Sequence, residues 1–385
     1  MLLGLFLVYL PVADQIIGVT ESFGFRLNDT PELNQRIQMI YSIAILSFMA
    51  GNLMVAFVRK SNAWGTGIEL KIEHGTAVRL LLIYQFVVWI LYLVNLNVSG
   101  ISIFSVLNPF NHQESSILFS ADYYWPILEL LSASVPVALF ILVVLGRAWN
   151  WRFWLFFFVW LILSLLGGWR FRIILFVLFI LFYYWNALRI RPVTVLAGMF
   201  LAMSMAWLTL NRMAIAKRQF DLITFDFRQF DLSLFNNEFS NCRTFRACLT
   251  QPGWDTFLGF SGWMKNPETQ KPRILEFAKS WIPAGWPWNP NPALSQPEEF
   301  FLLFGYAGMA IAMALIGVYC ALLDQLRNDW FHQSLRIVLS ALLFQWFSRG
   351  YFPFQLKITL ICMLPFLVLW FRSAYLSFQS DGNKT

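Results

Sequence analysis

The stretch Pro297–Gly308 reads PEEFFLLFGYAG and marks the point at which a long polar segment returns to apolar sequence. Residues 211–298 carry ten Lys or Arg and eight Asp or Glu side chains, with aromatic residues and prolines between them. Hydrocarbon cannot solvate so many charges. We therefore expect this segment to lie in water on one side of a membrane, and a connection of this length is more often functional than a spacer.

The composition of the chain is that of an integral membrane protein. Hydrophobic residues make up 58% of the 385 residues and charged residues only 13%, far from the averages of soluble domains. The apolar runs are continuous and do not alternate, which favours membrane-spanning helices over a barrel. We expect an all-α, polytopic fold. The net charge of +7 lies between the apolar runs, where it sets topology and meets lipid headgroups, so no nucleic-acid partner is expected.

The hydropathy pattern predicts about ten transmembrane helices within a single membrane domain, residues 1–385. Seven precede the long loop in residues 1–210, the loop occupies 211–298, and three more with a cytoplasmic tail follow in 299–385. The expected spans are residues 1–19, 38–58, 76–97, 126–146, 150–167, 171–188, 193–210, 299–322, 334–348 and 352–371.

The distribution of basic residues predicts the orientation of these spans. If both termini are cytoplasmic, the cytoplasmic loops and tail hold twelve Lys or Arg residues and the short outer loops hold five. Because short cytoplasmic loops are enriched in Lys and Arg, this orientation is favoured. It places the long loop on the extracytoplasmic side.

The cysteines leave one question open. Cys242 and Cys248 flank five residues of the long loop, a spacing compatible either with a small disulfide in an oxidising compartment or with two free thiols. Cys320 and Cys362 lie in expected spans and are interpreted as packing residues. No Cys/His pattern has metal-ligand spacing, so neither a metal site nor another cofactor is expected.

Arginines at three outer positions suggest an anion site. The sequence Gly167–Arg172, GGWRFR, places Arg170 and Arg172 between two apolar spans, and Arg349 occupies the short turn before the last span. Planar guanidinium groups offer forked donors to a pyrophosphate, and converging arginines would strengthen that interaction. The alternative is that they bind headgroups or snorkel to the interface.

Three acidic or basic side chains are candidates for a general base. Glu299 stands at the membrane edge of an apolar helix, where a carboxylate either takes a proton or favours the positive end of the helix dipole. His112, on the outer side, and Asp255, in the long loop, are the further candidates. The pair Gly305 and Gly308 is expected to allow close approach of another helix.

The long loop supplies further candidate ligands. Its arginines are additional phosphate-binding candidates, and its tryptophans either stack on sugar rings or anchor the loop at the interface. The candidate arginines are Arg212, Arg218, Arg243 and Arg246, and the candidate tryptophans are Trp281, Trp286 and Trp288.

Together these motifs resemble the Wzy-type oligosaccharide repeat-unit polymerases of O-antigen, capsule and exopolysaccharide pathways. The resemblance rests on Gly167–Arg170, on Glu299 with Phe304, Gly305 and Gly308 after a long loop, and on the Arg349-Gly350 turn before a final span. It covers a few dozen residues between 164 and 372. Phe171 separates Arg170 from Arg172, and Leu303 stands where the family often has Asn.

The resemblance implies a metal-independent glycosyl transfer on the extracytoplasmic face of a bacterial inner membrane. Donor and acceptor would be glycans linked to undecaprenyl pyrophosphate, with a chain-length regulator as a further partner beside the membrane lipids. Arg170, Arg172 and Arg349 would stabilise the leaving pyrophosphate, and Glu299 would take the hydroxyl proton, with His112 or Asp255 as alternatives.

Two other classes compete with this interpretation. An O-antigen ligase-like enzyme shares the architecture and the donor, but such enzymes typically use a histidine in the long outer loop, and residues 211–297 contain none. A lipid or glycan transporter would show internal repeats and charges deep in several spans, whereas here the charges between spans gather on the outer face.

Overall fold

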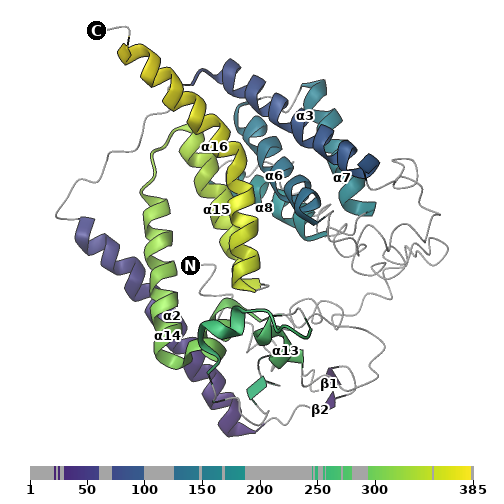
Figure 1. Cartoon of the computed structure of the whole chain (residues 1–385). Helices are drawn as coiled ribbons and strands as arrows, with labels where there is room; N and C mark the ends of the chain where they lie inside the picture. Colours follow the sequence, from purple (N-terminus) through teal and green to yellow (C-terminus); the bar gives the residue numbers. More distant parts are fainter. Residues whose placement is uncertain are drawn as a thin grey trace, which may run out of the picture. The chain divides into compact units, whose positions relative to one another are not determined.

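The structure is a computed structural model of the whole chain. It describes residues 21–22, 25–26, 30–59, 72–98, 125–146, 150–166, 170–186, 245, 248–249, 255, 257–269, 272–279, 294–348 and 351–382. Within these ranges the fold is helical apart from one pair of two-residue antiparallel strands, β1 (Glu21–Ser22) and β2 (Phe25–Arg26) (Figure 1).

The described helices follow the apolar runs of the sequence. They are α2 (Pro31–Arg59), α3 (His74–Val98), α6 (Trp125–Val144), α7 (Trp151–Leu166), α8 (Arg170–Asn186), the 3₁₀ helix η3 (Gly259–Trp263), α13 (Arg273–Lys279), α14 (Gln296–Asp324), α15 (Trp330–Ser348) and α16 (Phe352–Gly382).

Four of the expected spans are confirmed as helices long and apolar enough to cross a membrane. They are Pro31–Val58, His74–Asn95, Gln296–Asp324 and Phe352–Tyr375. Three shorter apolar helices, Ala133–Val144, Trp151–Ile162 and Arg172–Tyr184, fall inside the expected spans 126–146, 150–167 and 171–188, and α15 covers the expected span 334–348. The expected spans 1–19 and 193–210 lie outside the described residues. The described helices are those of a membrane-embedded protein.

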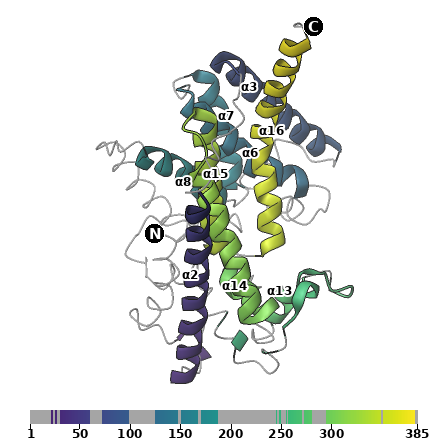
Figure 2. The same cartoon turned by 90° about the vertical axis from the view of Figure 1, so that its left-hand side faces the viewer.

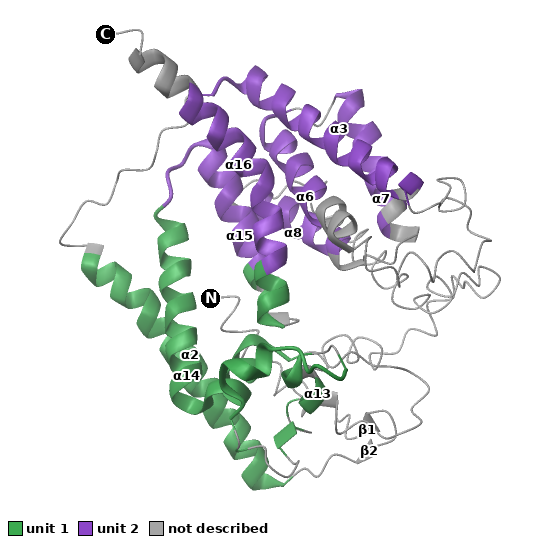
Figure 3. Cartoon of the chain, in the orientation of Figure 1, with its two compact units in different colours: residues 1–65, 232–325, 343–356 green, residues 66–231, 326–342, 357–385 purple. Residues whose placement is uncertain are grey.

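The chain divides into two compact units (Figure 3). Unit 1 comprises Met1–Gly65, Leu232–Gln325 and Leu343–Leu356, and unit 2 comprises Thr66–Asp231, Leu326–Leu342 and Lys357–Thr385. Unit 1 therefore joins α2, the described part of the long polar segment, α14 and the turn before α16, although these are far apart in the sequence.

In unit 1, α2 and α14 lie side by side, as both views show (Figures 1 and 2). Their contact depends on two glycines. A Cβ on Gly51 would meet the carbonyl oxygen of Ala314 at 2.0 Å, and a Cβ on Gly317 would meet that of Phe48 at 2.1 Å. The two backbones approach each other through these glycines, as small residues allow in membrane helix pairs.

The prediction that Gly305 and Gly308 admit another helix was wrong. A Cβ on Gly308 would meet Phe304 of its own helix at 2.1 Å, and a Cβ on Gly305 would meet the ring of Phe257, from the long polar segment, at 2.9 Å. Gly305 also interrupts α14, because its φ of 68° and ψ of −164° are not helical. That combination is essentially reserved for glycine.

Unit 2 is built around α6. Every residue from Ala133 to Leu142 is buried, as expected for a helix surrounded by others. The ring of Phe140 lies against Phe179 of α8, with 5.4 Å between centroids. The Cys362 thiol of α16 donates to the Ala133 carbonyl at 3.4 Å, which agrees with the prediction that this cysteine is a packing residue.

Candidate functional site: a carboxylate cluster at the start of α14

The start of α14 is set by local sequence. Ser295 is the N-cap residue, Pro297 occupies the first turn, and Glu298 and Glu299 bring negative charge to the positive end of the helix. The Glu298 carboxylate accepts the backbone N–H of Ser295 at 2.6 Å. This is one of the two hydrogen bonds of a capping box, in which the side chain of the third helical residue accepts the backbone N–H of the N-cap residue.

Glu298 is also tied to α2. The hydroxyl of Tyr41 donates to Oε1 of Glu298, and both side chains are buried. The Tyr41 ring meets Phe245 edge-on at 6.5 Å between centroids, and Phe245 in turn meets Phe301 of α14 at 5.8 Å. An apolar wall therefore surrounds a buried carboxylate whose two oxygens each have a hydrogen-bond donor.

Glu299 receives its donors from two other parts of unit 1. The indole N–H of Trp263, at the end of η3, donates to Oε1 at 2.6 Å. The backbone N–H of Phe352, at the start of α16, reaches both carboxylate oxygens at 3.1 and 3.0 Å. Only 1% of Glu299 is exposed. In the described part of the chain, no Lys, Arg or His forms an ion pair with it.

Aromatic rings enclose this carboxylate. Trp263 stacks on Phe352 with 5.4 Å between centroids and 27° between planes, and it meets Phe300 and Phe304 of α14 edge-on at 6.3 and 5.5 Å. The hydroxyl of Tyr351 donates to the Trp263 carbonyl at 2.9 Å, which fixes the indole from its backbone side. Among the described residues, Trp263 is half-buried while Glu299 is buried, so the indole is the more exposed partner of this hydrogen bond.

Two groups near the carboxylates, Tyr351 and Cys248, have raised pKa values. Burial raises the pKa of the Tyr351 hydroxyl, and the nearby charge of Glu299 raises it further. The pKa of the buried Cys248 thiol is raised by burial and then by the charge of Glu298. Cys248 is a free cysteine, so the structure supports the free-thiol alternative for it. Cys242 lies outside the described residues.

The chemistry open to Glu299 follows from these contacts. A buried carboxylate held by two N–H donors has a fixed orientation, and its oxygens are aimed at the aromatic cover. A general base must come within hydrogen-bonding distance of the proton it takes. Since only 1% of Glu299 is exposed and Trp263 contacts its carboxylate, the aromatic cover would have to move before a hydroxyl group could reach Glu299.

The remaining predicted residues fall into three groups. Asp255 is exposed in a turn, without a resolved contact to this cluster. Arg172 is buried in α8 near the Cys362 thiol, within unit 2, and Arg170 is the first residue of α8. The others lie outside the described residues: His112, Arg212, Arg218, Arg243, Arg246, Trp281, Trp286, Trp288 and Arg349. The expected convergence of Arg170, Arg172 and Arg349 therefore stays a prediction.

Three residues of the cluster were not predicted. Glu298 could have been found from the sequence, because Ser295 and Glu298 have capping-box spacing. Tyr41 and Trp263 had no such signal, since they lie 257 and 36 positions from the carboxylates that they contact.

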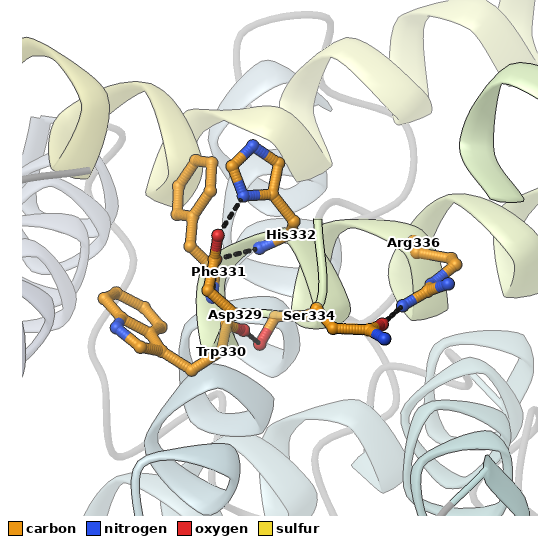
Figure 4. Close-up of polar contacts among 7 residues, drawn as sticks. Asp329, Trp330, Phe331, His332, Ser334 and Arg336 are labelled. Atoms are coloured by element: carbon orange, nitrogen blue, oxygen red, sulfur yellow. Dashed lines mark hydrogen bonds and ion pairs between the residues drawn. The ribbon is translucent and has the colours of Figure 1, made fainter. Parts of the chain in front are cut away.

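A second polar cluster stands at the start of α15, in unit 2 (Figure 4). Asp329 accepts the backbone N–H groups of Phe331 and His332 at 3.0 and 2.9 Å, and its Oδ2 lies 2.6 Å from Nδ1 of His332. Arg336 donates to Oδ1 of Asn328 at 2.9 Å.

The Asp329 carboxyl is perturbed by these contacts. Burial acts to raise its pKa, but the backbone and side-chain hydrogen bonds from His332, with the charge of that ring, outweigh burial and hold the pKa below its usual range. These hydrogen-bond partners all lie within eight residues of one another. This arrangement is a local helix cap.

Comparison with known proteins adds no further constraint. No protein-family model matches the chain, and searches of curated proteins and of solved structures found no significant match. Among the residues that the structure describes, no group of three or more His, Cys, Asp or Glu could hold a metal ion.

Proposed function

We propose that the chain polymerises undecaprenyl-pyrophosphate-linked oligosaccharide repeat units by glycosyl transfer on the extracytoplasmic face of a bacterial inner membrane. The proposal includes about ten spans, cytoplasmic termini and an outer loop at 211–298. It rests on the sequence resemblance and on one structural observation that the resemblance did not require.

That observation is the meeting of three sequence motifs at one carboxylate. Trp263 comes from the long polar segment, Glu299 from its return to apolar sequence, and Phe352 from the start of the last helix, just after the Arg349-Gly350 turn. The long segment, its return and this turn were each singled out from the sequence, and all three regions supply the contacts of Glu299. Arg349, a proposed pyrophosphate ligand, precedes Phe352 by three residues in the chain, and the N–H of Phe352 donates to Glu299.

The proposed reaction assigns a role to each group. The acceptor hydroxyl attacks the anomeric carbon of the donor, a new glycosidic bond forms, and the bond to pyrophosphate breaks with its electron pair leaving on the lipid-linked group. Glu299 takes the hydroxyl proton once Trp263 has moved aside. Arg170, Arg172 and Arg349 offset the negative charge of the leaving pyrophosphate.

The decisive experiment removes the gene from its native host and restores it as wild type or as Glu299→Gln, Arg170→Ala or Glu268→Gln. Glycans from the surface and from the lipid pool are then separated by size. Gln is close to Glu in volume but cannot take the proton, so Glu299→Gln should leave single repeat units. Arg170→Ala should do the same. Glu268 is exposed on the same segment, so Glu268→Gln is the matched control and should restore full chains.

The other outcomes identify the competing classes. Full-length polymer that stays on its undecaprenyl carrier after deletion would mark the protein as a ligase. Units trapped on the cytoplasmic side would mark a transporter. Normal chain lengths with Glu299→Gln, at wild-type protein abundance, would remove Glu299 from the mechanism.

A further inference from the structure

The segment around η3 presents an apolar surface to the exterior. Phe257 is 46% exposed, Phe260 is 71% exposed and Met264 is 63% exposed. These three side chains, which we call the η3 apolar face, fall within eight residues. Polar residues follow at once, because Lys265 and Glu268 are exposed as well.

The segment is fixed rigidly to α14. A Cβ on Gly262 would meet the Leu303 side chain at 2.2 Å, so the backbone of η3 lies directly against α14. The N–H of Leu258 donates to the Leu302 carbonyl at 3.4 Å, and Phe260 meets Phe304 with 5.0 Å between ring centroids. Along the axis of α14, η3 therefore lies at the same position as residues 302–304.

The length of α14 indicates the depth of residues 302–304 relative to the hydrocarbon core of a membrane. The helix is broken at Gly305, and residues 306–324 continue it to Asp324. These 19 residues span about 28 Å at 1.5 Å per residue, close to the thickness of the hydrocarbon core of a bilayer, about 30 Å. Residues 302–304 then lie at the boundary between hydrocarbon and headgroups.

The start of a second helix, α16, supports the same depth for η3. The candidate span Phe352–Tyr375 begins at the residue that stacks on Trp263, the last residue of η3. The first residues of two candidate spans, Gln296–Asp324 and Phe352–Tyr375, thus lie in unit 1 beside η3. Aromatic side chains are enriched at this depth because their rings suit the mixed environment of the headgroups.

We infer that the η3 apolar face inserts into the boundary between headgroups and acyl chains of the leaflet in which α14 begins, and contacts bilayer phospholipid. The exposed Phe257, Phe260 and Met264 then lie among acyl chains and glycerol groups, while Lys265 and Glu268 remain in water. This inference depends on the membrane-spanning helices and not on the proposed glycosyl transfer.

Photocrosslinking in the full-length protein tests this contact. The photoreactive p-benzoylphenylalanine replaces Phe260, Met264 or, as the control, Glu268, and each protein is placed in vesicles of phosphatidylethanolamine and phosphatidylglycerol. Irradiation followed by mass spectrometry measures phospholipid adducts. We expect at least about fivefold more adduct at positions 260 and 264 than at 268, since the first two side chains would lie in lipid.

Two results would overturn the inference. One is an equally low phospholipid yield at all three positions, which would mean that the face lies in water. The other is adducts only to protein, which would mean that another polypeptide covers it. Because all three positions are exposed, the bulky residue should leave the thermal unfolding temperature unchanged, and this is measured in parallel.

Discussion

The starts of α14 and α15 both carry acidic residues, and they differ in where their partners come from. At α14, Glu298 and Glu299 are held by Tyr41, Trp263 and Phe352, from three other parts of the chain. At α15, the partners of Asp329 are its neighbours Phe331 and His332. The difference separates a local cap, which stabilises one helix, from a long-range junction, which holds several segments of the fold in place.

The sharpest way to test this difference compares Glu299→Ala with Asp329→Ala. Loss of the buried Glu299 carboxylate leaves two partly buried donors without this acceptor and adds a void, so we expect a loss of about 3–5 kcal/mol. Loss of a cap such as Asp329 costs about 1 kcal/mol. Thermal or denaturant unfolding in detergent measures both. Equal losses would mean that the junction contributes no more than a cap.

The second largest effect is expected at the break in α14. Gly305→Ala places a side chain on a backbone with φ of 68° and ψ of −164°, beside the Phe257 ring, and should cost about 1–3 kcal/mol. Gly259→Ala is the control, because its φ is also positive but no atom lies within 4 Å of the added Cβ; about 1 kcal/mol is expected there. A fully tolerated Gly305→Ala would show that the break is not needed to position Glu299.

A smaller change removes a single donor from the junction. Trp263→Phe keeps a ring for stacking on Phe352 but deletes the indole N–H that donates to Glu299. We expect a loss of about 1–2 kcal/mol, as for a hydrogen bond to a charged group with some relaxation. The unfolding midpoint of Trp263→Phe is compared with that of Phe260→Leu, which removes an exposed ring. The difference measures the contribution of the indole N–H to stability. If the two variants unfold alike, the indole N–H contributes nothing.

The smallest effect concerns acid sensitivity at the local cap. Because the folded-state pKa of Asp329 is depressed, its stabilising contribution is present above the unfolded-state value, about 3.9, and is lost as the pH falls through the folded-state pKa. The stability difference between wild type and Asp329→Asn should therefore shrink below about pH 4. A difference that stays constant from pH 7 to pH 3 would show that the charge of Asp329 plays no part.

Much of the fold could be predicted from the sequence, because hydrocarbon imposes simple rules. A helix that crosses a membrane satisfies its own backbone and needs only a run of apolar residues, so α2, α3, α14 and α16 were predictable from hydropathy. The start of α14 could also be predicted, since Ser295 and Glu298 have capping-box spacing. These features depend on residues that are close together in the chain.

The role of individual glycines was not predictable in this way. Gly305 and Gly308 were expected to admit a neighbouring helix, but Gly51 and Gly317 do so, while Gly305 breaks the helix beside Phe257. A glycine in the sequence indicates only that another group comes close to the backbone at that position. Which element fills that space depends on how α2 and η3 pack on α14.

By itself the sequence determined the membrane class, the helices that are long and apolar enough to cross a membrane, and the carboxylate at the end of the long polar segment. Only the tertiary structure decided that Glu299 is enclosed by Trp263 and Phe352, and that Glu298 is bound by Tyr41. The physical reason is the separation in sequence over which each interaction acts. Hydropathy and helix capping act over a few turns, whereas the partners of a buried carboxylate are chosen by packing between segments that the sequence keeps far apart.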